Sequence, residues 1–264
     1  MQVVHLICVA GSALATVMGT YFWLSTDGVL PRLPNIIGPT SSDSSLNATA
    51  LLKTAKDLWN DIKPVLKEFP ELPCGAYDSD ILALLSVAHL LRVEVILESG
   101  TGTGRTAWFM GRFLSDVKVV TVDLSGTGKN SSCTKHVQAA HAKLATLPNV
   151  EAHIGDSFKA IPELMKKHKG KRIGLFIDGP KETAAVKLCA QSLLNSSDVK
   201  YCIFHDAKNS GRRILFRSLS QWGRTVALLC CWQPWVDAWP NGSMGLVAGT
   251  DYIPFGATND TWWR

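Results

Sequence analysis

The segment from Val93 to Ala107, VEVILESGTGTGRTA, constrains the fold of this chain more than any other. Its apolar half does not alternate with polar residues, which is typical of a parallel strand buried on both faces. Glycines follow at positions 100, 102 and 104, and they let the backbone turn tightly and approach a ligand. Residues 106–114 are predicted to form a helix whose free N–H groups face that ligand. The segment therefore predicts a strand–turn–helix unit that binds a nucleotide-like cofactor.

Strands and helices alternate along the middle of the chain. Strands are expected at 93–99, 118–123, 150–155, 172–178 and 199–205, and helices at 50–68, 78–92, 105–115, 133–146, 157–168, 181–194 and 209–221. This alternation predicts an α/β fold with a doubly wound, mostly parallel sheet. The tail differs, because TVALLCC and SMGLVAG are expected to be two strands joined by a Trp/Pro/Gly-rich connection without a helix. We expect a seven-stranded sheet that ends in an antiparallel hairpin.

An acidic residue stands at or beside the end of each predicted parallel strand. These strand-end residues are Glu98, Asp123, Asp156, Asp178 and the pair His205–Asp206. Ligands of an open parallel sheet bind at the carboxyl ends of its strands, and a carboxylate at the position of Asp123 is well placed to hold a ribose hydroxyl. Asp156 has an equal alternative role, because it or Ser157 would also cap the following helix.

The pattern Glu98-x-Gly100-x-Gly102-x-Gly104 resembles motif I of the class I S-adenosylmethionine-dependent methyltransferases. The resemblance spans about residues 78–249 and includes the terminal hairpin, since the last strand runs antiparallel in that family. It implies that Glu98 helps to orient the methionine part of the cofactor and that Asp156 approaches the adenine amino group. Two of the glycines, with Ala107, also match the dinucleotide fingerprint G-x-G-x-x-A. An NAD(P)-dependent oxidoreductase therefore stays an alternative.

The segment LFIDGPKE places Asp178 three residues before Lys181. This spacing resembles the catechol and caffeoyl-CoA type O-methyltransferases, in which the aspartate binds a divalent metal and the lysine takes the proton from the substrate hydroxyl. A hard cation held by carboxylates lowers the pKa of a coordinated hydroxyl. A partly desolvated lysine near a cation has a lowered pKa and can act as a base. The alternative is that Lys181 is a solvated residue of the first helical turn.

The last parallel strand ends in CIFHDAKN. In the same subfamily an Asp-Asn pair completes the metal site; Asp206 matches the aspartate, but Ala207 stands where the asparagine is expected. His205 is a candidate metal ligand or general base, because its ordinary pKa is near neutral, or else a buried structural histidine. We thus expect Lys181 and His205 to be catalytic, and Asp178 and Asp206 to hold a divalent cation such as Mg²⁺.

Residues 1–25 are predicted to form a signal anchor, followed by a flexible stalk at 26–49 and the catalytic domain at 50–264. The run from Val3 to Leu24 has no Lys, Arg, Asp or Glu and is long enough to cross a bilayer as a helix. A signal peptide cleaved near Ala13-Leu14-Ala15 is the alternative. The stalk is rich in Pro, Ser, Gly and Asn and lacks apolar periodicity.

Glycosylation sequons and cysteines bear on the compartment. Asn-x-Ser/Thr occurs at Asn47, Asn130, Asn195, Asn241 and Asn259, and together with the anchor these sequons favour a luminal domain in the secretory pathway. Six cysteines lie beyond the anchor. Disulfides are allowed in that compartment, but the spacing leaves their pairing open. Cys202 and Cys230, in predicted core strands, are equally plausible as free thiols.

These observations predict a membrane-anchored enzyme that moves a methyl group from S-adenosylmethionine to an oxygen of a glycan or small molecule. No nucleic-acid partner is expected, because the formal charge of +5 is modest and the lysines and arginine of 166–172 lack interleaved aromatic residues. A cofactor-binding protein without catalysis and an interaction domain that keeps only the fold are further alternatives. The tryptophans at 232, 235 and 239 are expected to pack under the hairpin instead of lining a substrate pocket.

Overall fold

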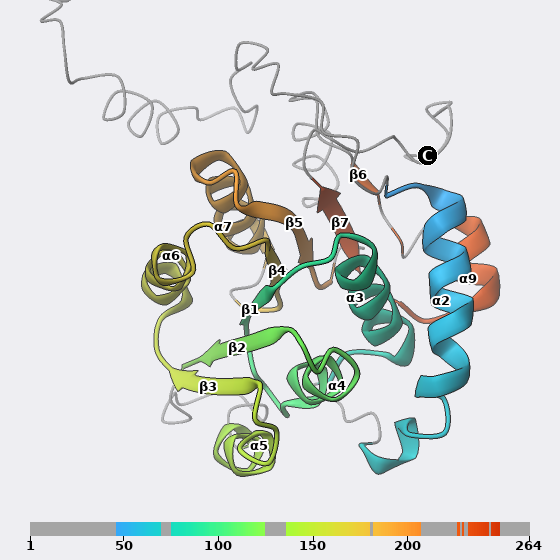
Figure 1. The fold of residues 1–264 in the computed structure, drawn as a ribbon, viewed down its shortest axis with the longest axis horizontal. Coiled ribbons are helices and arrows are strands. Elements are labelled where there is room, and N and C mark those ends of the chain that lie inside the picture. The colour runs from blue at the N-terminus through green and yellow to red at the C-terminus, as the bar shows by residue number, and fades with distance from the viewer. Residues whose placement is uncertain are drawn as a thin grey trace, which may run out of the picture.

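The computed structural model describes residues 46–69, 75–124, 136–179, 182–206, 226–227, 229, 232–242 and 244–248. Its elements are α2 (Ala48–Ile62), η1 (Leu66–Glu68), α3 (Asp78–Leu90), β1 (Val95–Ser99), α4 (Arg105–Phe113), β2 (Lys118–Asp123), α5 (Val137–Leu144), β3 (Val150–Ile154), α6 (Ser157–Lys167), β4 (Ile173–Ile177), α7 (Glu182–Asn195), β5 (Val199–Phe204), β6 (Val226–Ala227), α9 (Gln233–Ala238) and β7 (Gly245–Ala248) (Figure 1). The expected helix at 209–221, the expected anchor at 1–25 and most of the expected stalk lie outside the described residues.

The sheet confirms the predicted α/β architecture. Its strand order is β3-β2-β1-β4-β5-β7-β6, and the first five of these strands are parallel. β7 runs antiparallel to both β5 and β6. This strand order, with an antiparallel last strand, agrees with the fold that the resemblance of motif I implies. The order of the strands reverses between β1 and β4, so their carboxyl ends flank the switch point at which ligands of such sheets bind.

Helices cover both faces of the sheet (Figure 1). Val95 and Leu97 of β1 belong to an apolar cluster that also includes residues of α6 and α7. Ile96, which points to the opposite face, joins a second cluster with residues of α2, α3 and α4. All five residues of β1 are buried, which explains why its sequence is apolar without alternation.

The connection between the last two strands corrects one prediction. It contains the helix α9, although no helix was expected there. Pro234 stands in the first turn of α9, where a missing N–H costs nothing. Trp235 and Trp239 follow at helical spacing and are buried against each other, with ring centroids 4.7 Å apart. Trp239 also contacts Trp59 of α2 edge-on, so these tryptophans belong to the core, as expected.

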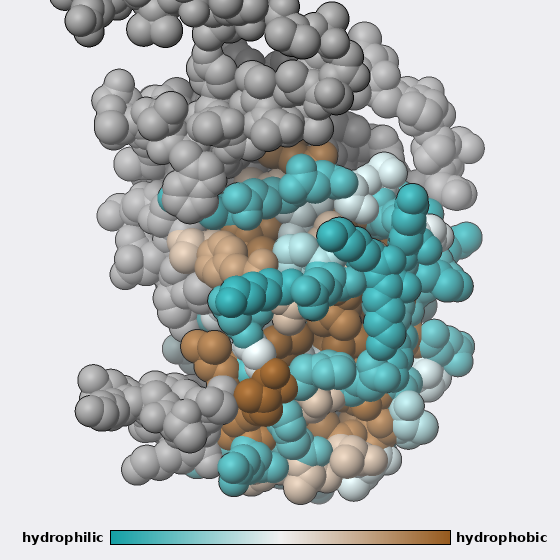
Figure 2. Space-filling view, turned by 90° about the vertical axis from the view of Figure 1, so that its left-hand side faces the viewer, coloured by the Kyte–Doolittle hydropathy of each residue, from teal (hydrophilic) through white to brown (hydrophobic). Residues whose placement is uncertain are grey.

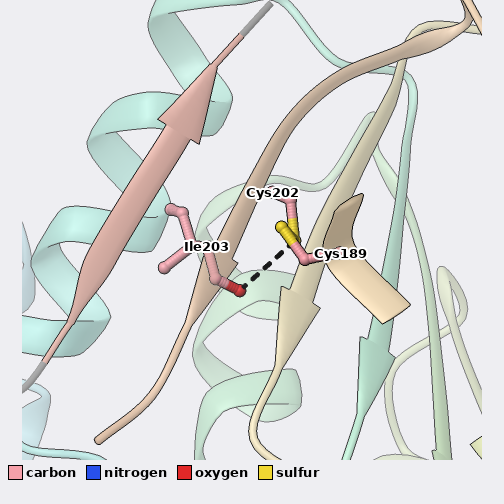
Figure 3. Close-up of a disulfide and its surroundings, with 3 residues drawn as sticks. All are labelled: Cys189, Cys202 and Ile203. Carbon is pink, nitrogen blue, oxygen red and sulfur yellow. Dashed lines mark hydrogen bonds between the residues drawn. A yellow bond between two sulfur atoms is a disulfide. The ribbon is translucent and has the colours of Figure 1, made fainter. Parts of the chain in front are cut away.

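A disulfide joins α7 to β5 within the apolar cluster that contains Val95 and Leu97 (Figure 3). Cys189 and Cys202 are both fully buried, their Cα atoms lie 5.8 Å apart, and 13 residues separate them in the sequence. The carbonyl of Ile203 lies 4.0 Å from the sulfur of Cys202. The pairing that the sequence left open is therefore settled for these two cysteines, whereas the other four beyond the expected anchor lie outside the described residues.

None of the helices described from residue 46 onward is both long and apolar enough to cross a bilayer. α2 begins at Ala48, where the Asn47 side chain caps it by accepting a hydrogen bond from the Ala50 N–H at 2.9 Å. α2 therefore begins two residues before the helix expected at 50–68.

Candidate functional site

The glycine turn after β1 has a backbone that side chains would not tolerate. Gly100, Gly102 and Gly104 have φ values of +97°, +51° and +79°, in a region that favours glycine. A Cβ on Gly100 would lie only 2.7 Å from the amide nitrogen of Gly179. The backbone of the turn after β1 is therefore in close contact with the residues that follow β4. Two backbone bonds hold it, from the Gly100 N–H to the Val122 carbonyl at 2.8 Å and from the Gly104 N–H to the Thr101 carbonyl at 2.7 Å.

Asp123 lies beside this turn, as the sequence predicts. The Gly102 N–H donates to one carboxylate oxygen of Asp123 and the Leu124 N–H donates to the other, each at 2.7 Å. Both oxygens keep acceptor capacity, because a carboxylate offers about four lone-pair positions. The two amides thus fix a half-buried carboxylate at the carboxyl end of β2 with room for hydroxyl donors.

Glu98 lies underneath the turn and is fully buried. One of its carboxyl oxygens accepts a hydrogen bond from the hydroxyl of Thr106, and the other, Oε2, is buried without a hydrogen bond. Burial raises the pKa of Glu98 to about 8; the hydrogen bond from Thr106 opposes this rise, while the charges of Asp178 and Asp123 add to it. Glu98 therefore offers a ligand an acceptor that no described protein group uses.

Asp156 caps α6, because its carboxylate accepts a hydrogen bond from the Phe158 N–H at 2.9 Å. The predicted contact of Asp156 with adenine stays a prediction. Three apolar side chains that the sequence analysis missed are exposed around the ends of β2 and β3: Leu124 (62%), Ile154 (52%) and Phe158 (41%). Apolar residues do lie open among polar ones on the side of the molecule that carries α6 (Figure 2). The sequence signal that could have found them is an apolar residue one or two positions from a strand-end acid.

The ends of β4 and β5 bring together three of the predicted residues. Nδ1 of His205 lies 3.2 Å from Asp178 Oδ1 and 3.3 Å from Asp206 Oδ1. The amides of Asp178 and Gly179 both donate to the Ser99 carbonyl, at 2.8 and 2.9 Å. This bond pair fixes the cluster of Asp178, His205 and Asp206 next to the glycine turn.

Asp80 is a further member of this cluster that the sequence analysis did not identify. Its Oδ2 lies 3.1 Å from Nε2 of His205, although 125 residues separate the two in the sequence. The same oxygen accepts a hydrogen bond from the Tyr77 N–H at 3.2 Å, at the start of α3. The side chain of Asp80 is only 1% exposed. An acidic residue in the first turn of a helix is common, so the sequence alone gave no reason to connect Asp80 with the strand ends.

The charge of His205 follows from these neighbours. Burial of the ring lowers its pKa, but hydrogen bonds to Asp178, Asp206 and Asp80 outweigh this effect and raise the pKa to about 12. Without a bound cation, an imidazole in this setting is protonated at neutral pH, and a divalent ion that binds Nδ1 would displace its proton. A protonated ring cannot accept a proton, so the geometry does not favour His205 as the general base. Lys181, the other predicted base, lies outside the described residues.

The cluster fits a divalent cation. One ligand atom each from Asp178, His205 and Asp206 can be chosen so that all three lie within 4.8 Å of one another. Two ligands at right angles around an ion at about 2.1 Å would be about 3.0 Å apart, close to the two nitrogen–oxygen distances of 3.2 and 3.3 Å. Carboxylate oxygen and imidazole nitrogen are both common ligands of divalent metals.

A hollow of about 510 Å³ lies elsewhere, between α6 and α7. Gly170 and Asp198, which precede β4 and β5, line it together with Met165 and Leu188. These residues belong to the amino-terminal edge of the sheet, opposite the glycine turn. We do not assign the hollow to the functional site, because none of the strand-end residues lines it.

No protein-family model and no curated protein sequence matches this chain. Solved structures with a similar fold include the O-methyltransferase TomG from Streptomyces achromogenes, in complex with SAM. TomG is 17% identical to this chain, the match covers 78% of this chain and 92% of TomG, and the TM-score is 0.47. The SAH-bound methyltransferase PaMTH1 from Podospora anserina is 13% identical over 93% of this chain and 99% of its own, with a TM-score of 0.46. The precorrin-6y C5,15-methyltransferase from Geobacter metallireducens is 12% identical; the match covers 61% of this chain and 79% of that chain, with a TM-score of 0.46. The site assignment therefore rests on the geometry of this chain.

Proposed function

We propose that this chain is an S-adenosylmethionine-dependent methyltransferase that acts on a hydroxyl oxygen. The observation that carries the proposal is the glycine turn, whose Gly102 N–H is bound to the Asp123 carboxylate at the switch point of the sheet. The cluster of Asp178, His205 and Asp206 lies directly beside this turn. A cofactor site and a polar site thus adjoin each other, as a transfer reaction requires.

The residues around the turn match the parts of S-adenosylmethionine. Asp123 would accept hydrogen bonds from the ribose hydroxyls. Glu98 Oε2, which is buried without a hydrogen bond, would accept one from the amino group of the methionine part. The exposed apolar side chains of Leu124, Ile154 and Phe158 would contact the adenine ring. The cofactor therefore supplies a partner for each of these exposed or unsatisfied groups.

The chemistry proposed is a displacement at the methyl carbon. The bond from that carbon to sulfur breaks, its electron pair stays on sulfur, and a new bond forms to the acceptor oxygen. The protein must hold donor and acceptor in line and remove the hydroxyl proton. A divalent ion on Asp178 and Asp206 would lower the pKa of the hydroxyl, and Lys181 would take the proton. The acceptor we propose is a hydroxyl of a glycan or small molecule.

Asp123→Ala tests the cofactor site. The variant loses a charged acceptor for the ribose hydroxyls, so we expect S-adenosylmethionine to bind about ten- to a hundredfold more weakly by calorimetry, which corresponds to about 1.5–3 kcal/mol. Asp198→Ala is the matched control, because the carboxylate of Asp198 also accepts a backbone amide bond, from Gly170 at 2.8 Å, but belongs to the opposite edge of the sheet. Affinity unchanged in Asp123→Ala would reject the proposed site, and binding of NAD or NADP by the wild type would favour the oxidoreductase alternative.

We further propose a luminal, membrane-anchored location. The anchor and the sequons are its sequence basis, and the disulfide between Cys189 and Cys202 supports it, because structural disulfides persist in oxidising compartments. Expression in a eukaryotic secretory host should give a protein whose apparent mass falls on glycosidase treatment and which stays in membranes after alkaline extraction. A glycosylated but extractable product would indicate cleavage of the N-terminal segment, and an unglycosylated product would contradict the luminal location.

A further inference from the structure

We propose that His205 is the third protein ligand of a divalent ion at Asp178 and Asp206, and that Asp80 is the positioning residue that turns its Nδ1 toward them. This inference deepens the proposed function and rests on it for the presence of the ion. It also predicts which ion the site prefers, because a nitrogen ligand replaces the oxygen ligand expected at the third position.

The orientation of the His205 ring carries the first step. Its two nitrogens face opposite partners: Nε2 lies 3.1 Å from Asp80, and Nδ1 lies 3.2 and 3.3 Å from Asp178 and Asp206. The ring is only 10% exposed. Since Asp80 is acceptor-only when ionised, it keeps a proton on Nε2. In the neutral ring the lone pair must then be on Nδ1, which faces the two carboxylates.

The second step is that Asp80 is held firmly. It belongs to the first turn of α3, and two residues earlier Asp78 pairs with the guanidinium of Arg105. Arg105 is 1% exposed, opens α4 directly after the glycine turn, and also donates to the carbonyl of Phe69 at 2.8 Å. The start of α3 is thus fixed to the cofactor turn. A ring held by Asp80 therefore has a defined position relative to the cofactor.

The third step concerns the ion. A carboxylate that binds the far nitrogen of a metal-bound histidine fixes its tautomer and makes it a better ligand, and loss of such a partner lowers metal affinity about 10- to 100-fold. Imidazole suits transition ions, whereas Mg²⁺ prefers a shell of oxygens and keeps several waters. Ala207 has no donor atom in its side chain. A site of two carboxylates and one imidazole should therefore bind Mn²⁺ more tightly than Mg²⁺.

The test is Mn²⁺ binding to the purified full-length protein, followed by electron paramagnetic resonance of free and bound Mn²⁺. We expect wild-type protein to bind Mn²⁺ at least tenfold more tightly than Mg²⁺ in competition, with a ¹⁴N coupling from imidazole in the bound signal. His205→Gln should abolish that coupling, and Asp80→Asn should weaken Mn²⁺ binding about 10- to 100-fold. Asp198→Asn is the matched control: its carboxylate also accepts a backbone amide bond, from Gly170 at 2.8 Å, but it lies before β5 at the opposite edge of the sheet, so Mn²⁺ affinity should stay unchanged.

Three results would overturn the inference: no Mn²⁺ binding by the wild type, bound Mn²⁺ without ¹⁴N coupling, or equal Mn²⁺ affinity in the wild type and His205→Gln. Should Asp80→Asn fail to fold, the coupling measured in the wild type and in His205→Gln still decides whether His205 is a ligand.

Calorimetry with S-adenosylmethionine on the same preparations distinguishes failure of the proposed metal ligand from failure of the proposed methyltransferase function. Cofactor binding without Mn²⁺ binding rejects the metal ligand alone, whereas Mn²⁺ binding with ¹⁴N coupling but no cofactor binding supports the ligand and rejects the proposed function.

Discussion

Replacing Glu98 by glutamine is expected to stabilise the cofactor-free protein at pH 8 and to weaken its binding of S-adenosylmethionine. Glutamine keeps the shape of the side chain and an oxygen that can accept the Thr106 hydroxyl bond. It removes the charge that is costly to bury, and it removes the acceptor that we assign to the amino group of the cofactor. The substitution should thus separate the stability of the fold from the function of the site.

The size of the expected stabilisation follows from the pH dependence of the free energy of unfolding. The carboxyl of Glu98 has a pKa of about 8 in the folded protein, raised by burial from an ordinary value of 4.5. Between these two values the folded state keeps a proton that the unfolded chain releases. The contribution of Glu98 to the free energy of unfolding is therefore fully present below pH 4.5 and falls as pH rises, by up to roughly 1.4 kcal/mol per pH unit, until about pH 8. A glutamine side chain does not titrate, so the variant does not lose this part of the free energy of unfolding as pH rises.

Denaturant unfolding at several pH values between 5 and 8.5 measures the effect. The stability difference between Glu98→Gln and the wild type should shift in favour of the variant with each step in pH, while calorimetry at pH 7.5 should show cofactor affinity at least tenfold lower. Glu163→Gln, an exposed position on α6, is the control and should change neither quantity. A stability difference that does not vary with pH would contradict the burial of an ionisable carboxyl, and unchanged cofactor affinity would contradict its proposed contact.

The parts of this site that the sequence predicts are those fixed by local chain geometry. The glycines must adopt positive φ wherever a strand turns so tightly into a helix, and Asp123 is the last residue of β2. Parallel neighbours then place every strand end on one edge, which is why Asp178 and His205 meet. None of these steps requires knowledge of how the helices pack.

The features that the sequence did not predict depend on packing between distant segments. Asp80 reaches His205 only because α3 lies on the sheet with its first turn at the carboxyl edge, and no spacing rule connects positions 125 residues apart. α9 forms because its two tryptophans find a buried surface next to α2. A short segment gains little from helix propensity alone, so tertiary contact decides such cases.

Removal of the disulfide between Cys189 and Cys202 is expected to lower the free energy of unfolding by about 3 kcal/mol, the value for a closed loop of about 15 residues. The physical reason is that the cross-link restricts the unfolded chain, while both sulfurs lie in the core between α7 and β5 (Figure 3). Cys189→Ala combined with Cys202→Ala should show this loss by denaturant unfolding. A reductant should destabilise the wild type by a similar amount and leave the double variant unchanged.

The disulfide has a direct chemical signature in the chain itself. Trypsin cuts after Lys187, Lys200 and Lys208, so the two cysteines fall in adjacent peptides, 188–200 and 201–208, which stay linked without reductant and separate with it. Mass spectrometry of the unreduced digest should find this linked pair. Its absence, or a wild type whose stability does not respond to reductant, would contradict the cross-link.

The disulfide also affects the candidate metal site, because β5 leads directly from Cys202 to His205. Looser attachment of β5 to α7 should therefore reduce Mn²⁺ binding in the double variant, whereas the glycine turn and Asp123, at the ends of β1 and β2, should keep their affinity for the cofactor.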